Sequence, residues 1–253
     1  MDLSLDSGLL VGYSSGRQQA RLVTEMWASS NFYCPNCLEP QVSPEKVGSP
    51  LVDFRCSNPS CGQTFQLKSQ KSKFGRVLRD AAYRPWINSM KLGTTPNLTL
   101  LQYDVRRLRV VNVEVIPSFF LRPSCFESWL LSTREHYEMC SIHLNMIGPD
   151  ARIKIVQGGE IMDQTQVQAQ FKSFAWMRHA SWRNRGWTAD VLRCIRDTGK
   201  TQFTLHDVYA YESTLQKLHP ENKFVRPKIR QQLQVLRDRG FLTFTRPGCY
   251  EIA

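Results

Sequence analysis

The sequence predicts a mixed α/β (α+β) domain that carries a metal-binding hairpin, followed by a small C-terminal module. Three observations support this class. Helical and strand patterns are mixed along the chain as far as Met177. Four of the eight cysteines fall between Cys34 and Cys61. From Thr188 onward, three helical patterns precede two short strands around a Pro247-Gly248 turn. We therefore expect two domains, at residues 1–180 and 187–253.

Composition and charge exclude several classes of protein. The 253 residues are 42% hydrophobic, which is enough for a sizeable core. No stretch approaches the ~18 apolar residues of a membrane span. Asp2 and Asp6 stand where a signal peptide carries Lys or Arg, so we expect a soluble, cytoplasmic protein without a disulfide framework. The formal net charge of +11 is typical of a protein that binds a polyphosphate.

The spacing of apolar residues predicts the elements of the first domain. A helix is expected over Arg17–Ser29 and another over Lys73–Tyr83, where Phe74, Val77, Leu78 and Ala81 would face inward. Runs rich in Val, Ile and Leu predict strands at Leu98–Tyr103 and Leu108–Ile116. Shorter strands are expected at Ile142–Leu144 and Ile153–Val156, and a closing helix at Gln164–Met177.

The polar, basic stretch Arg178–Gly186 predicts a linker, after which Thr188 can cap a helix that Gly199 closes. Further helices are expected at Leu205–Leu218 and Val225–Arg239, and a hairpin over Phe241–Ile252. Three helices and a hairpin follow the order of a winged helix, whose third helix enters the DNA major groove. Its DNA-binding candidates are Arg226, Lys228, Arg230, Gln231, Gln234 and, on the wing, Arg246. The alternatives are a solvated basic face or a module for protein contacts.

The cysteine cluster predicts a structural zinc site. Cys34 and Cys37 form one knuckle, and Cys56 and Cys61 form a second that is two residues longer than the usual spacing. Four thiolates leave no open position for water, so such a zinc ion would not be catalytic. The alternative is a group of buried free thiols, which is how we interpret the other four cysteines.

The second knuckle also joins two expected strands, Leu51–Cys56 and Gln63–Ser69. Asp53 on the first strand would meet Gln66 and Lys68, which share one face of the second. This is the arrangement of a metal-dependent nuclease: Asp53 and Gln66 would hold a divalent ion, and Lys68 would orient water and stabilise the transition state. Lys71 and Lys73 just downstream are candidate phosphate contacts, as are Arg76 and Arg79. Alternatively, Lys68 lies at a strand edge and Asp53 caps a turn.

Together these segments resemble the methyl-directed restriction endonucleases of the Dpn type and the related dam-replacing proteins. The resemblance is carried by Cys34-Pro-Asn-Cys37, Asp53-Phe54, Leu67-Lys68-Ser69, Arg185-Gly-Trp-Thr188, Phe203-Thr-Leu205, Lys228-Ile-Arg-Gln-Gln-Leu-Gln234 and Leu236-Arg-Asp238. It implies a PD-(D/E)xK nuclease domain with an embedded zinc site, a C-terminal winged helix, and magnesium-dependent cleavage of double-stranded GATC that carries N6-methyladenine. Neither a small-molecule substrate nor a membrane partner is implied.

Two departures from this family keep alternatives open. Gln66 stands where the family has a metal-binding Glu, so the chain could instead be a non-catalytic reader of methylated DNA. An inactivating substitution at this position is a further alternative. Tyr137 is the nearest match to an indole-bearing residue expected at the methyl groups. A smaller aromatic wall leaves 5-methylcytosine as another candidate for the modified base.

Overall fold

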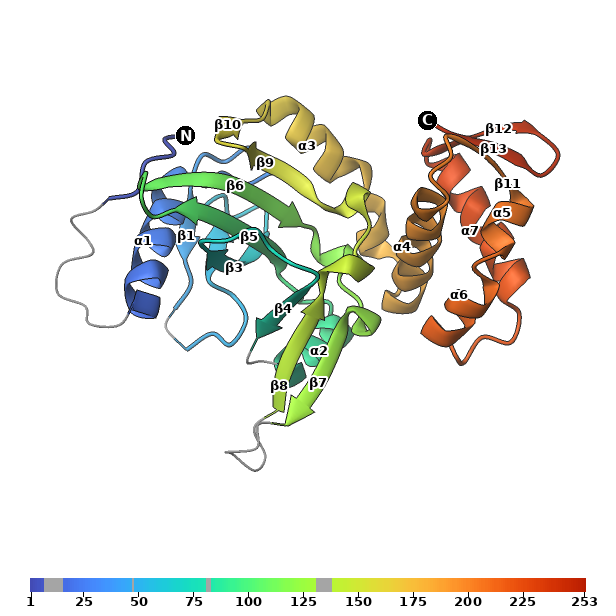
Figure 1. The fold of residues 1–253 in the computed structure, drawn as a ribbon, viewed down its shortest axis with the longest axis horizontal. Helices are drawn as coiled ribbons and strands as arrows, with labels where there is room; N and C mark the ends of the chain where they lie inside the picture. Colours follow the sequence, from blue (N-terminus) through green and yellow to red (C-terminus); the bar gives the residue numbers. More distant parts are fainter. Residues whose placement is uncertain (7–15, 47, 81–82, 131–137) are drawn as a thin grey trace.

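A seven-stranded sheet organises the N-terminal part of the computed structural model, which describes all residues except 7–15, 47, 81–82 and 131–137 (Figure 1). Its strands lie in the order β1-β2-β3-β5-β6-β9-β10. Neighbours are antiparallel except for β3 and β5, which are parallel. The bounds are β1 Val42–Pro44, β2 Phe54–Cys56, β3 Thr64–Gln70, β5 Asn97–Asp104, β6 Arg109–Ile116, β9 Ile153–Gln157 and β10 Glu160–Ile161.

The central strand β5 divides two apolar cores because its side chains alternate between the two faces of the sheet. Leu101 and Tyr103 belong to a core shared with α1 (Gly16–Asn31) and α3 (Gln164–Ser173). Leu98 and Leu100 belong to the other core, which includes α2 (Tyr83–Leu92). The predicted first helix and the two long strands are confirmed. The predicted closing helix is shorter, since a 3-10 helix at Ala175–His179 replaces its last turn.

The helix predicted over Lys73–Tyr83 is wrong, because this segment contributes a strand to a second, three-stranded sheet. Its order is β4-β8-β7, with β4 at Val77–Asp80, β8 at Glu138–His143 and β7 at Phe126–Leu130. The strand β4 pairs antiparallel with β8, which lies some sixty residues further along the chain. Helical spacing of the apolar residues is coincidental here, because Val77 faces solvent. The predicted strand at Ile142–Leu144 is the end of β8, and Leu144 begins a 3-10 helix.

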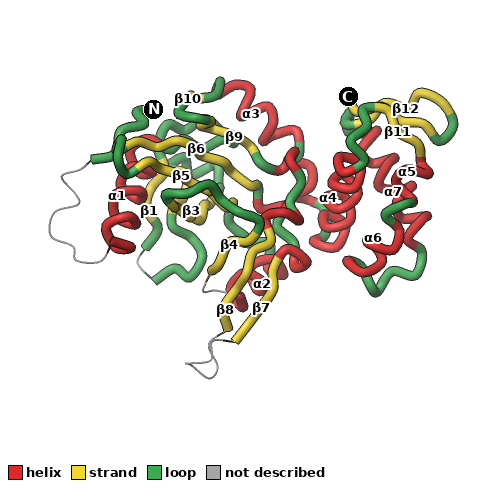
Figure 2. The backbone as a smooth tube through the Cα atoms, viewed as in Figure 1, coloured by secondary structure: helices red, strands yellow, loops and turns green. Residues whose placement is uncertain are grey.

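The C-terminal module is mostly helical, as the red segments of Figure 2 show. It contains α4 (Trp182–Asp197), α5 (Leu205–Tyr209), α6 (Glu212–Leu218) and α7 (Val225–Asp238). A three-stranded sheet β11-β13-β12 closes it, formed by Gln202–Thr204, Cys249–Ile252 and Leu242–Arg246. The predicted helix Leu205–Leu218 is two helices, because the Tyr211 amide bonds to the Val208 carbonyl in a tighter turn. The strand β11 was not predicted.

The predicted linker near Arg178–Gly186 is wrong, because α4 begins within it. Ser181, not Thr188, is the N-cap, and its side chain accepts from the Asn184 amide. Thr188 lies inside the helix and donates to the side chain of Gln232, 2.7 Å away. Gly186 packs inside this helix, where a Cβ would stand in van der Waals contact, 3.4 Å from the His219 ring. A polar sequence with one glycine therefore marks a packed helix start rather than a flexible connection.

The junction cluster, formed by Arg122, Asp190 and His219, joins the two parts of the molecule. Arg122 precedes a 3-10 helix of the N-terminal part, and its guanidinium pairs with Asp190 of α4. The second oxygen of Asp190 lies 3.0 Å from Nε2 of His219. Burial opposes ionisation of Asp190, but Arg122 and His219 outweigh it and lower its pKa. Apolar residues of both parts form one continuous core around this cluster.

Candidate active site

The four cysteines of the two knuckles converge on one point. Their sulfur atoms all lie within 4.8 Å of one another, and Cys34–Cys61 and Cys37–Cys56 are 3.7 and 3.5 Å apart. A tetrahedral zinc ion with Zn–S bonds near 2.3 Å requires sulfur atoms about 3.8 Å apart, so the donor set fits. Burial raises the pKa of Cys34 and raises that of Cys56 to about 12. A cation is what would hold these thiols deprotonated at neutral pH.

The hairpin of β2 and β3 extends from this cluster to the predicted acidic residue. Cys56 donates its amide to the Gln63 carbonyl, and Asp53 donates its amide to the Phe65 carbonyl, both at 2.9 Å. The turn that carries Cys56 and Cys61 therefore closes one end of the hairpin, and Asp53 stands at the other. Asp53 Oδ2 accepts from the Leu67 amide at 2.8 Å, which fixes the carboxylate against β3.

Asp53, Gln66 and Lys68 line one cleft of about 650 Å³. The sequence prediction that these three residues meet is therefore matched by the geometry. Gln66 is 5% exposed, and its Oε1 has no hydrogen-bond partner among the described residues. A buried amide oxygen without a donor is costly, so this atom is poised to accept from a ligand or to bind a cation.

Two acidic residues that sequence analysis missed also face the cleft. Asp80, at the end of β4, accepts from Lys68 Nζ through Oδ1 and from Trp86 Nε1 through Oδ2, each at 2.9 Å. Glu25 reaches the cleft from α1, where Arg21 pairs with it at 2.6 Å. Sequence analysis missed Asp80 because the apolar spacing of this segment predicts a helix instead of the strand β4. Glu25 lies within the helix predicted over Arg17–Ser29, and no local pattern there marks it as a site residue.

Electrostatics of the cleft favour a cation next to Asp53. Burial raises the pKa of Asp53, and the charge of Glu25 adds to this effect. The Leu67 amide and the Lys68 ammonium act in the opposite direction without cancelling the rise. The Asp53 carboxylate and the Gln66 amide oxygen are the hard oxygen ligands that suit Mg²⁺. These two residues are the ones that would hold it.

The predicted DNA-binding residues are spread over both parts of the molecule. On α7, Arg226 pairs with Glu212 at 2.7 Å, Lys228 donates to Asn184 and Arg230 to the Tyr209 hydroxyl. Gln231 and Gln234 are exposed on the same helix. Arg246 lies on β12, where Nε contacts Cys249 Sγ at 3.3 Å. Lys71 and Lys73 are exposed after β3, outside the residues that line the cleft. Tyr137 lies outside the described residues.

Comparison with known families accounts for nearly the whole chain. Residues 1–180 match the model of the Dam-replacing family, and residues 183–252 match the Dam-replacing HTH domain. The chain belongs to the Dam-replacing family. Membership in the Dam-replacing family supports a restriction endonuclease that binds DNA through its C-terminal helix-turn-helix domain. Among the described residues, no helix combines the length and apolar composition that a bilayer crossing requires.

Proposed function

We propose that this chain is a methylation-dependent type II restriction endonuclease that cleaves double-stranded GATC containing N6-methyladenine. The observation that carries the proposal is the buried Gln66 amide oxygen, which lies beside the Asp53 carboxylate and the Lys68 ammonium and has no hydrogen-bond partner in the described part of the chain. In this proposal, residues 1–180 form a PD-(D/E)xK nuclease domain and residues 187–253 a winged-helix domain. The family match supports both assignments.

Each side chain of the cleft would have a separate task. Asp53 and Gln66 would hold a divalent ion, and Mg²⁺ bound there supplies charge that stabilises the attacked phosphate and acidifies a water molecule. Lys68 would donate to that water or to a phosphate oxygen. Asp80 would act as a positioning residue, because its carboxylate holds the Lys68 ammonium and is itself fixed by the Trp86 indole. The water oxygen would bond to phosphorus as one P–O ester bond breaks and the leaving oxygen takes a proton.

The sequence would be read by exposed residues of α7, and Tyr137 is the candidate for contact with the methyl groups. Arg and Gln side chains recognise guanine and adenine edges in the major groove. A methyl group adds an apolar contact that a shaped pocket can detect. Arg230, Gln231 and Gln234 are the exposed side chains of α7 that we propose for base contacts.

Plasmid digestion with magnesium tests the proposal. Three substrates are compared: GATC with N6-methyladenine, the same plasmid without modification, and one with 5-methylcytosine. We expect cleavage of the first alone, and none with Asp53→Ala or Lys68→Ala. Lys172→Ala is the matched control, since this exposed lysine of α3 lies outside the cleft and is not among the proposed DNA contacts. Cleavage of the third plasmid alone would instead assign the protein to 5-methylcytosine.

A non-catalytic reader of methylated DNA is the second candidate function. It is favoured by the uncharged amide of Gln66, which binds a divalent ion more weakly than a carboxylate. A reader would retard methylated duplexes in a binding assay and cut none of the three plasmids. Binding without cleavage would therefore select this function.

A further inference from the structure

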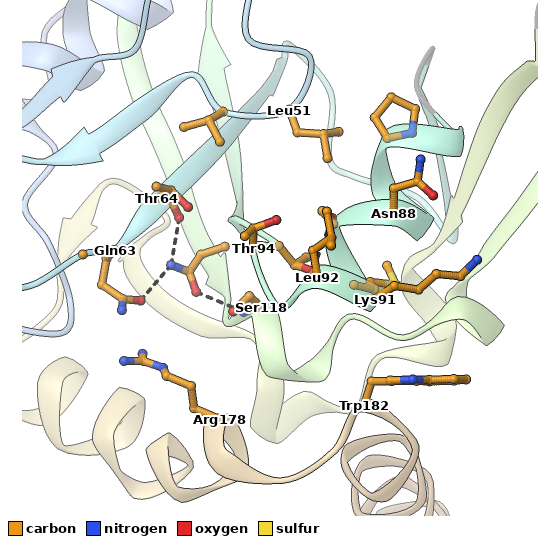
Figure 3. Close-up of a pocket in the computed structure, with 18 of the residues that line it drawn as sticks. Leu51, Gln63, Thr64, Asn88, Lys91, Leu92, Thr94, Ser118, Arg178 and Trp182 are labelled. Carbon is orange, nitrogen blue, oxygen red and sulfur yellow. Dashed lines mark hydrogen bonds between the residues drawn. The ribbon is translucent and has the colours of Figure 1, made fainter.

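A second cavity of the described structure lies outside the cleft. It is a hollow of about 1130 Å³ between the turn that carries Cys56 and Cys61, α2 and the start of α4 (Figure 3). Gln63 and Thr64 form one wall, Lys91 and Leu92 the opposite wall, and Arg178 and Trp182 the floor of this view. We call it the hollow. Ser49, Pro50, Arg84 and Pro85 line both the hollow and the cleft, so the two cavities share a rim.

Charge in the hollow has one sign. Its lining includes five cationic side chains: Arg55, Arg84, Lys91, Arg178 and Arg185. No aspartate or glutamate is among the described residues that line it. Arg55 and Arg84 pair with Glu45 and Glu138, but the other three have no ion pair with any described residue. The three cations that lack an ion pair with any described residue create a positive potential that attracts an anion.

The N-terminal turn of α4 adds to this positive potential, and the cations placed there destabilise the helix. Ser181, Trp182 and Arg185 of its N-terminal turn line the hollow. Unpaired amides at a helix N-terminus carry partial positive charge, so acidic residues stabilise that position and cations destabilise it. The first turn of α4 nevertheless has no acidic residue and includes Arg183. Burial without a counter-charge also lowers the pKa of Arg185. A bound anion would compensate for both effects.

We infer that the hollow binds the sugar-phosphate backbone of the DNA duplex beyond the recognition sequence. This inference rests on the proposed function, because the shared rim leads a duplex held in the cleft toward the hollow. Polar side chains of the lining, including Gln63, Asn88 and Thr94, offer further donors to phosphate oxygens. Trp182 is 40% exposed and offers a flat apolar surface to a deoxyribose. Contacts of this kind carry no sequence information.

A charge-matched pair of variants tests the inference in the full-length protein. Lys91→Ala/Arg178→Ala removes two exposed cations of the hollow. Arg106→Ala/Arg107→Ala removes two exposed cations from the turn between β5 and β6, which lines neither cavity. Affinity is measured, with calcium in place of magnesium, for a methylated duplex that ends at the recognition sequence and for one with a helical turn of flank on each side. Thermal unfolding establishes that both variants fold.

We expect the hollow variant to lose about tenfold in affinity for the flanked duplex and little for the short one. Its slope of log K against log salt should fall by about 0.9 for each phosphate that the variant no longer neutralises. The control variant should change both duplexes equally and by less. Neutral methylphosphonate linkages placed in the flank should weaken binding of the parent protein and have no further effect on the hollow variant.

Two results would overturn the inference. Equal losses in the two double variants would mean that only net charge matters. Competition by inorganic phosphate without any effect of the methylphosphonates would mean that the hollow holds a small anion instead of DNA. Failure of the proposed function would look different. The parent protein would then cut no plasmid, or cut all of them alike, but the hollow variant would still lose affinity for the flanked duplex alone.

Discussion

The amide of Gln66 decides how strongly the cleft would hold a divalent ion. A carboxylate at this position would place a second negative charge beside Asp53, whereas the amide contributes only a dipole. Gln66→Glu is therefore expected to maintain cleavage of methylated plasmid, and to raise it at limiting magnesium. Initial cleavage rates over a magnesium titration give the measurement. Higher magnesium demand in the variant would contradict the assignment of Gln66 as a metal ligand.

The carboxylate of Asp80 is expected to matter through Lys68. Asp80→Asn keeps an acceptor for the Trp86 indole but removes the charge that holds the Lys68 ammonium. Partners that orient the residues of a metal site typically contribute about 10- to 100-fold in activity, so we expect single-turnover cleavage to slow by this amount. Affinity for methylated DNA should stay unchanged. Asp104→Asn, at the end of β5 and outside the cleft, is the matched control. An equal loss in both variants would contradict a role for Asp80.

At the scale of elements, the hairpin of β2 and β3 links metal binding to the cleft. We expect about one tightly bound zinc ion per chain, because four sulfur atoms at these distances close a tetrahedral site. Cys56→Ser should abolish this zinc, lower the melting temperature and reduce cleavage, since Asp53 stands at the other end of the same hairpin. Elemental analysis and thermal unfolding provide the measurements. Cys249→Ser, outside the cluster, should retain the metal, and a zinc-free parent protein would refute the site.

The exposed face of α7 should carry sequence recognition. Gln231→Ala is expected to weaken binding to the target duplex by about 1–3 kcal/mol and to relax specificity at one base pair. Gln202→Ala on β11 is the control, because it removes an exposed amide elsewhere in the same module. Binding to a panel of single-base variants of the target supplies the test. An unchanged affinity profile would place recognition on other residues.

Local patterns predicted those elements that depend on neighbours in sequence. A short stretch of sequence is enough to predict the apolar stripe of α7, the two cysteine knuckles, and the paired strands β5 and β6. The strand β4 does not, because its partner β8 lies far along the chain and no pattern near Asp80 indicates it. The stretch around Gly186 was wrongly predicted to be a linker for a related reason, since His219 and Arg122, which pack against Gly186, come from distant parts of the sequence.

In the candidate site, sequence analysis therefore identified the residues on the hairpin of β2 and β3 and missed those contributed by other elements. Asp53, Gln66 and Lys68 share adjacent strands that a single turn connects. Glu25 and Asp80 join them only through the packing of α1 and β4. Convergence of distant elements is a property of the folded chain, and a single sequence contains no local signal for it.

For the whole molecule, the junction cluster should contribute more to the free energy of unfolding than any exposed ion pair does. Removing one partner of a buried ion pair leaves an uncompensated charge, so Asp190→Ala is expected to lower the free energy of unfolding by about 3–5 kcal/mol. The exposed pair of Arg237 and Asp238 gives the control, because Asp238→Ala should cost well under 1 kcal/mol. Chemical denaturation followed by circular dichroism measures both. Equal effects would mean that the cluster contributes no more than a surface pair.

The same cluster predicts a dependence on acid. Because the pKa of Asp190 is lower in the folded chain than its ordinary value of 3.8, the unfolded state binds its proton more readily. Its stabilisation is present above about pH 4 and is lost as the pH falls further. The free energy of unfolding of the parent protein should thus decline more steeply below pH 4 than that of Asp190→Asn. Parallel profiles would contradict the lowered pKa.

A continuous core around Arg122, Asp190 and His219 also bears on how members of this family can exchange their DNA-binding ends. A chimera joined at Ser181 takes the arginine from one parent and the aspartate and histidine from the other. Two parents that both keep these residues and the glycine at position 186 should recombine into a stable hybrid with the target preference of the second. A parent with a side chain longer than a methyl group at that position would press against the His219 ring, because a Cβ there already stands 3.4 Å from it. Compatibility at this boundary, more than similarity elsewhere, should decide which hybrids fold.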